Sequence, residues 1–119
     1  MAQSTVHFQE SGSGTYVICI HSSASFSGQW RALMASLSEK YHAVAVDLYG
    51  YGKSPDWPAV NDVRLADEIA LIEPILSQAG HFHLVGHSYG AHISLKIALD
   101  NPDRVASLTL YEPTAFEKQ

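Results

Sequence analysis

Short apolar runs alternate along the chain with longer segments in which apolar residues recur at helical spacing. The runs are apolar throughout rather than alternating with polar residues, which is typical of strands that are covered on both faces. Strong runs lie at residues 16–20, 43–48, 82–85 and 107–111. A weaker run at residues 5–8 is followed by the turn-forming residues 11–14.

The segments between the runs predict helices at residues 29–40, 63–78 and 91–99. Pro74 lies inside the second of these and predicts a kink or a break there. Asn101 and Pro102 end the third, because the residue before a proline disfavours helix. Strands that alternate with helices predict a parallel sheet built from βαβ units. There is no repeat or linker, so the chain is one domain or part of one.

Composition narrows the function classes. The chain has 119 residues, of which 46% are hydrophobic and 16% charged, and this suits a packed core. A net charge of −5 and scattered basic residues argue against nucleic-acid binding. No leader pattern opens the chain, and no apolar run approaches the ~20 residues that span a bilayer. Cys19 is alone and lies in an apolar run, which indicates a buried side chain without a disulfide. We therefore expect a cytoplasmic protein without membrane contact.

The chemistry is carried by Gly86-His87-Ser88-Tyr89-Gly90, a G-x-S-x-G motif. It follows an apolar strand and opens a helix, which is the setting of a nucleophile elbow. In such an elbow a strained turn lifts the serine hydroxyl above the sheet, and glycines at residues 86 and 90 allow close backbone approach. The alternative is an ordinary glycine-rich turn in which Ser88 caps the helix. The context favours Ser88 as a nucleophile.

Over essentially its whole length the chain resembles the α/β-hydrolase fold family. The resemblance rests on the motif above and on three further segments in the family's order. These are Ile20-His21-Ser22-Ser23, like the family's His-Gly-x loop; Asp47-Leu48-Tyr49-Gly50-Tyr51-Gly52-Lys53-Ser54, like its D-x-x-G-x-G-x-S loop; and residues 101–110, like the segment after the nucleophile.

The resemblance implies an α/β fold: a three-layer sandwich with a mostly parallel sheet, incomplete at its C-terminal edge. Residues 1–119 would be a partial α/β-hydrolase domain that holds about the second to the sixth strand, with the elbow at 86–90. The resemblance also implies an oxyanion hole made of backbone N–H groups from Ser23 and Tyr89. The family has Gly where this chain has Ser22, and Ser23 is otherwise an ordinary loop serine. Asp47 is expected to be structural.

The family's triad order is Ser, then Asp or Glu, then His. His92 is the last histidine of the chain and lies in the helix after Ser88, where the family does not place its base. His87 is expected to support the turn, and His21 to brace the oxyanion loop. Glu112, at the end of the last strand, has two interpretations: the triad acid, as in haloalkane dehalogenases, or a carboxylate at the rim of the site.

The resemblance thus implies a serine-dependent hydrolase of esters, thioesters or lactones that works through an acyl-enzyme, without cofactor or metal. The isolated chain would be inactive, because its base is expected beyond Gln119. The alternatives are a truncated inactive fragment and a non-catalytic ligand-binding domain. The expected partners are a small-molecule substrate and, at the exposed sheet edge, either the C-terminal half or a second copy.

Overall fold

The computed structural model describes residues 6–23, 25–49, 52, 54 and 65–112. The strands are β1 (Phe8–Gly12), β2 (Tyr16–Ile20), β3 (His42–Val46), β4 (Phe82–His87) and β5 (Val105–Tyr111). The helices are η1 (Ser27–Trp30), α1 (Arg31–Leu37), α2 (Leu65–Ala79) and α3 (Tyr89–Asp100). Each strong apolar run overlaps a strand, as predicted, although β3 ends at Val46 rather than at residue 48. The helix predicted at residues 29–40 is formed by η1 and α1, which ends at Leu37. Residues 5 and 63–64 of the expected elements lie outside the described residues.

Two local expectations differ from the structure. The first strand is Phe8–Gly12 rather than residues 5–8. Its backbone pairs with β3 in an antiparallel register, with Phe8 opposite Val46 and Gly12 opposite His42. Here a sheet partner overrides weak local propensity. The second difference is that α2 continues through Pro74 without the break that was one of the two expected outcomes there. Buried residues on both sides of the proline, including Leu71 and Ile75, hold the helix on the sheet.

The strands form one sheet in the order β1-β3-β2-β4-β5. β1 is antiparallel to β3, and the remaining pairs are parallel. In the registers of β2, Ile20 is opposite both Val46 of β3 and Gly86 of β4. The carboxyl ends of these three strands therefore meet at one edge of the sheet, which is where α/β proteins place their sites.

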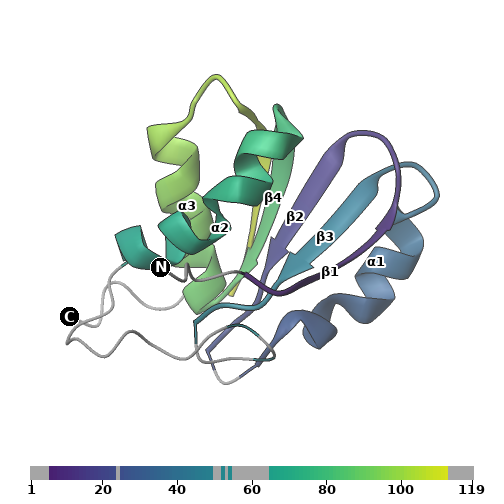
Figure 1. Cartoon of the computed structure of the whole chain (residues 1–119), viewed down its shortest axis with the longest axis horizontal. Coiled ribbons are helices and arrows are strands. Elements are labelled where there is room, and N and C mark those ends of the chain that lie inside the picture. The colour runs from purple at the N-terminus through teal and green to yellow at the C-terminus, as the bar shows by residue number, and fades with distance from the viewer. Residues whose placement is uncertain (1–5, 24, 50–51, 53, 55–64, 113–119) are drawn as a thin grey trace, which may run out of the picture.

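Helices cover both faces of the sheet, with α2 and α3 on one side and α1 on the other (Figure 1). Successive strand residues enter different cores: Ile18 and Ile20 pack with α2 and α3, whereas Val17 and Cys19 pack with Trp30 and Met34. This explains why the runs are apolar at every position. The fold is therefore the predicted three-layer α/β sandwich. Cys19 is buried in the second of these cores, and this burial raises the pKa of its thiol to about 12.

β5 departs from this pattern although its sequence is as apolar as that of β4. It is the last strand of the sheet order, and most of its residues are exposed, with Tyr111 at 55%. Leu99, near the end of α3, is 69% exposed. The sheet is incomplete at this edge, as expected. None of the helices in the described ranges is long and apolar enough to cross a membrane.

Candidate active site

The turn between β4 and α3 has the strained geometry of a nucleophile elbow. Ser88 has φ 56° and ψ −115°, a backbone conformation that residues other than glycine rarely adopt. The turn is held from both sides: Ser88 N–H donates to the carbonyl of Tyr111 at 3.1 Å, and its own carbonyl accepts from Ala91 N–H at 2.8 Å. A strained residue of this kind costs roughly 1–3 kcal/mol and persists only where its surroundings fix it.

Both glycines of the motif are required by close contacts. A Cβ on Gly90 would lie 2.1 Å from the carbonyl oxygen of Ile20. A Cβ on Gly86 would lie 2.5 Å from the carbonyl oxygen of Gly90 and from Ser94 Oγ. The start of α3 therefore packs directly against the end of β2. Any side chain at residue 90 would push the helix away from the loop that follows β2.

The side chain of Ser88 does not serve the helix. Ser88 occupies the N-cap position of α3, yet its hydroxyl makes no capping hydrogen bond. The interpretation of Ser88 as a simple capping residue therefore lacks the contact on which it depends. The hydroxyl is half-buried at the positive end of the helix dipole, where developing negative charge is stabilised.

The loop after β2 lies beside this elbow and is braced by His21. The imidazole is fully buried, and its Nδ1–H donates to Ser22 O at 2.7 Å while Nε2 accepts from Leu48 N–H at 3.0 Å. Burial lowers the pKa of His21, and the Ser22 carbonyl and the Asp47 charge oppose this shift in part. A neutral ring with one donor and one acceptor thus ties the loop to the end of β3, in agreement with the expected role of His21.

Ser22 and Ser23 differ in what their backbones do. Ser22 N–H donates to Gln29 Oε1 at 3.1 Å, so the first N–H after His21 is already committed. Ser23 is the next residue and is exposed on the same loop. The assignment of Ser23 N–H as an oxyanion donor stays a prediction.

Tyr89, the residue after Ser88, is anchored by a buried carboxyl group. Its hydroxyl donates to Glu68 Oε2 at 3.0 Å, and Glu68 Oε1 accepts from Tyr49 N–H at 3.2 Å. Burial raises the pKa of Glu68, and these two hydrogen bonds offset the rise in part. Glu68 was missed by the sequence analysis. The available signal was a carboxylate on the apolar face of α2, one turn from Leu65 and Ile72.

Glu112 lies at the rim of the elbow and contacts its histidine. Glu112 Oε1 is 3.2 Å from His87 Nε2, while the other ring nitrogen, Nδ1, is 2.6 Å from Gln29 Nε2. The carboxylate is 70% exposed, and the His87 ring packs against Tyr111 with 4.7 Å between ring centroids. Both nitrogens of His87 are therefore engaged away from Ser88.

The other histidines lie at several places in the fold, and several of them have partners other than Ser88. His7 pairs with Asp47, His42 with Glu10 and His83 with Ser107, while His21 is braced as described. His81 precedes β4 at the opposite end of that strand from Ser88. His92 lies one turn into α3, where its N–H is 3.3 Å from Ser88 O. Among the described residues, no group of His, Cys, Asp or Glu is arranged to hold a metal ion.

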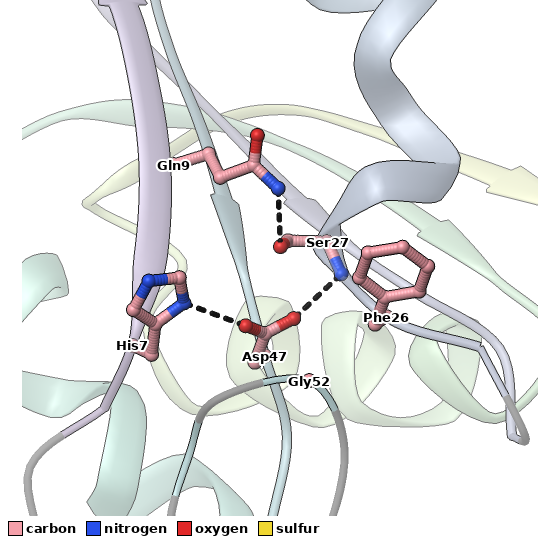
Figure 2. Close-up of a pocket in the computed structure, with 6 residues that line it drawn as sticks. All are labelled: His7, Gln9, Phe26, Ser27, Asp47 and Gly52. Carbon is pink, nitrogen blue, oxygen red and sulfur yellow. Dashed lines mark hydrogen bonds and ion pairs between the residues drawn. The ribbon is translucent and has the colours of Figure 1, made fainter.

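A second polar cluster lies at the end of β3, in a cavity of about 570 Å³ (Figure 2). Asp47 Oδ1 accepts from Ser27 N–H at 2.6 Å, and Oδ2 pairs with His7 Nδ1 at 2.7 Å. The Asp47 carbonyl accepts from Ser54 Oγ at 2.6 Å, and a Cβ on Gly52 would meet the carboxylate. Every oxygen of this buried residue is thus bonded within the fold, which agrees with its expected structural role.

Comparison with known proteins shows which family the chain resembles in sequence and structure. A model of the alpha/beta hydrolase fold matches residues 15–118. Pimeloyl-[acyl-carrier protein] methyl ester esterase of Nitrosomonas europaea is 30% identical over 110 residues, which are 92% of this chain and 42% of that protein. The 2-(acetamidomethylene)succinate hydrolase of Mesorhizobium japonicum is 37% identical over 116 residues, 94% of this chain and 40% of that protein.

Among solved structures, a thioesterase domain from the curacin biosynthetic pathway superposes with a TM-score of 0.84 at 28% identity. The match covers 91% of this chain and 42% of that domain. The chain therefore spans about two fifths of the length of these three proteins.

Proposed function

This chain belongs to the α/β-hydrolase fold family, and we propose on that basis that it carries the nucleophile and the oxyanion hole of a serine hydrolase. The observation that carries the proposal is Ser88, held at φ 56° at the start of α3 with its hydroxyl outside any capping bond. A protein keeps such strain where the surroundings fix it, and such residues cluster at active sites.

The proposed reaction is hydrolysis of a carbonyl compound through an acyl-enzyme. Ser88 Oγ attacks the carbonyl carbon, and a base takes its proton. The backbone N–H groups of Ser23 and Tyr89 stabilise the oxyanion, each donor being worth about 3–4 kcal/mol in such sites. The acyl-enzyme is then attacked by water, which releases the acid and restores Ser88.

The substrate class we propose is an ester, a thioester or a lactone. Two of the relatives above bear names that denote such chemistry, a methyl ester esterase and a thioesterase domain. A serine nucleophile suits these substrates because each forms an acyl-serine with a leaving alcohol or thiol.

The base is proposed to come from outside these 119 residues. All seven histidines lie in the described ranges, and none of their described contacts joins a ring nitrogen to Ser88. The isolated chain is accordingly expected to be inactive. Glu112 is proposed to be a rim carboxylate rather than the triad acid, because it bonds His87.

The partner that we propose for the exposed edge at β5 is the remaining polypeptide of the full-length protein, meaning the natural polypeptide that contains these 119 residues. Exposed Leu110 and Tyr111 offer apolar surface on β5, which has no strand neighbour beyond β4 among the described residues, and such an edge drives association. The isolated chain should therefore self-associate with rising concentration in size-exclusion chromatography. A stable monomer that unfolds sharply would contradict this.

A fluorophosphonate probe tests the proposed function in the full-length protein. Peptide mass spectrometry is expected to find the probe on Ser88, and Ser88→Ala should abolish labelling. Ser77→Ala is a matched control, because Ser77 is exposed on α2 and bonds Glu73. Absence of labelling, as in a non-catalytic ligand-binding domain, or labelling that survives in Ser88→Ala, would refute the proposal.

A further inference from the structure

One series of hydrogen bonds joins four segments of the chain at the carboxyl edge of the sheet. It runs from Ser22 after β2, through Gln29 of η1 and His87 at the end of β4, to Glu112 after β5. The links are 3.1 Å from Ser22 N to Gln29 Oε1, 2.6 Å from Gln29 Nε2 to His87 Nδ1, and 3.2 Å from His87 Nε2 to Glu112 Oε1. Gln29 and His87 are 58 positions apart in the sequence.

The direction of every bond in this chain follows from one unambiguous donor. Because Ser22 N–H is a backbone donor, the atom that faces it must be the amide oxygen of Gln29. The NH₂ group of Gln29 then faces His87, and since it only donates, His87 Nδ1 must carry a lone pair. The ring proton is therefore on Nε2, from which it is donated to Glu112.

All donors thus point the same way, toward the carboxylate. Hydrogen bonds in such a series polarise one another. The negative charge of Glu112 makes His87 Nδ1 a better acceptor, and this in turn strengthens Gln29 Oε1 as the acceptor for Ser22 N–H. Tyr111 packs on the ring and limits its rotation.

We propose that Gln29 and His87 are positioning residues that hold the loop after β2 in the place where Ser23 N–H serves as an oxyanion donor. Gln29 binds Ser22 N–H, so the loop presents the next N–H, that of Ser23, to the reacting carbonyl. His87 fixes the orientation of the Gln29 amide. The last step, from loop position to rate, rests on the proposed function above.

This arrangement makes the loop sensitive to the protonation of His87. A proton on Nδ1 would face the NH₂ group of Gln29, donor against donor, and the amide would have to turn or leave. Ser22 N–H would then lose its acceptor. Among the described contacts of the ring, Glu112 from the end of β5 is the charged group, while Gln29 from η1 and Tyr111 of β5 are neutral.

Gln29→Ala and Gln29→Glu separate positioning from general structural loss in the full-length protein. Gln29→Ala removes the acceptor of Ser22 and is expected to lower kcat about 10- to 100-fold with little change in KM. Such a loss stays below the 10²–10³ that removal of a donor itself causes. Gln29→Glu keeps an oxygen for Ser22 N–H and offers a second one to a protonated His87 Nδ1. It should restore most of kcat.

A second measurement does not depend on catalysis. Nitrogen NMR of the histidine rings should show His87 with its proton on Nε2 in the wild type and on both nitrogens in Gln29→Glu. Amide exchange at Ser22 should accelerate about tenfold or more in Gln29→Ala, the loss of about one hydrogen bond. If these hold while Ser88→Ala keeps its activity, the network is present and the proposed function is wrong.

His83→Gln is the matched control, because His83 also lies on β4 and bonds a neighbouring strand at Ser107, at 2.6 Å. It should leave kcat and its pH profile unchanged. The proposal is overturned if Gln29→Ala keeps kcat within twofold, if Gln29→Glu loses as much as Gln29→Ala, or if His87 carries its proton on Nδ1 in the wild type.

Discussion

Two polar clusters lie at the same edge of the sheet, and they are built in opposite ways. Around Asp47 both carboxylate oxygens and the carbonyl are hydrogen-bonded, to Ser27, His7 and Ser54 (Figure 2). Around Ser88 the backbone is fixed as firmly, but the hydroxyl is left outside the capping bond that its position offers. Hydrogen bonds to every oxygen offset the cost of burying the Asp47 charge, whereas the strained backbone of the half-buried Ser88 costs stability without a capping bond in return.

The comparison shows that the cavity described around Asp47 is a poor guide to the chemistry. That cavity is lined by His7, Asp47 and Ser27, residue types that suggest a catalytic triad. Yet Ser27 meets the carboxylate with its backbone N–H, and its hydroxyl oxygen accepts from Gln9 Nε2 at 2.8 Å rather than bonding the His7 ring. The described contacts therefore contain no relay from acid to histidine to serine. The candidate nucleophile lies elsewhere, on a turn.

The largest expected effect comes from Ser88→Ala in the full-length protein. Turnover should fall by roughly 10⁴- to 10⁶-fold, because the acyl-enzyme cannot form. The free energy of unfolding should change by less than about 0.5 kcal/mol, since the hydroxyl makes no capping bond. Esterase assays and urea unfolding measure both. Retained turnover, or a loss of several kcal/mol in stability, would erase the distinction between the clusters.

Asp47→Ala should produce the opposite result. The substitution leaves the buried Ser27 N–H without its acceptor, which costs about 1–3 kcal/mol, whereas the His7 ring is 36% exposed and reaches solvent. Urea unfolding of the full-length protein should show this loss. Below the new unfolding midpoint, fluorophosphonate labelling of Ser88 should continue at a similar rate. A folded but unreactive Asp47→Ala variant would instead place Asp47 in the chemistry.

Gly90→Ala and Gly52→Ala compare the two clusters at equivalent contacts. The new methyl groups would lie 2.1 Å from Ile20 O and 2.3 Å from Asp47 Cγ, respectively. Overpacking of this kind costs about 1–3 kcal/mol, and the positive φ of Gly52 adds strain. Thermal unfolding should show a loss in both variants. Gly90→Ala should also lower kcat, because it displaces α3 from the loop after β2; equal kcat losses in both variants would contradict this.

The positions of the strands and of the elbow could be predicted from the sequence, but the side-chain contacts around the two clusters could not. Apolar runs located β2, β3, β4 and β5 because each strand residue enters one of two cores, and the G-x-S-x-G pattern located the elbow because its glycines are sterically required. The partners of the elbow were out of reach. Gln29 and Glu68 look like ordinary helix residues until folding brings them to His87 and Tyr89.

The differences between the predicted and observed elements have a similar cause. The first strand was predicted too early because Val6 and Phe8 are apolar, whereas pairing with β3 selects Phe8–Gly12. The break at Pro74 did not occur, because burial of Leu71 and Ile75 outweighs the roughly 3 kcal/mol that an internal proline costs. In both cases tertiary contacts decided between local preferences that a single sequence cannot rank.

The smallest expected effect concerns His21, which connects the two clusters by bonding Ser22 O on one side and Leu48 N–H on the other. Burial holds the pKa of His21 below that of an ordinary histidine, near 6.5. As the pH falls below that value, the unfolded chain binds a proton that the folded protein resists, so the free energy of unfolding decreases toward acid pH.

His21→Gln removes this titration while keeping an amide oxygen for Leu48 N–H and an NH₂ group for Ser22 O. Its unfolding free energy, measured in urea from pH 7 to pH 5, should therefore fall less steeply than that of the wild type. The remaining histidines contribute to both curves, so the difference in slope isolates His21. Parallel curves would mean that the buried ring accepts a proton without cost, and that the neutral brace between Ser22 and Leu48 does not describe the folded protein in solution.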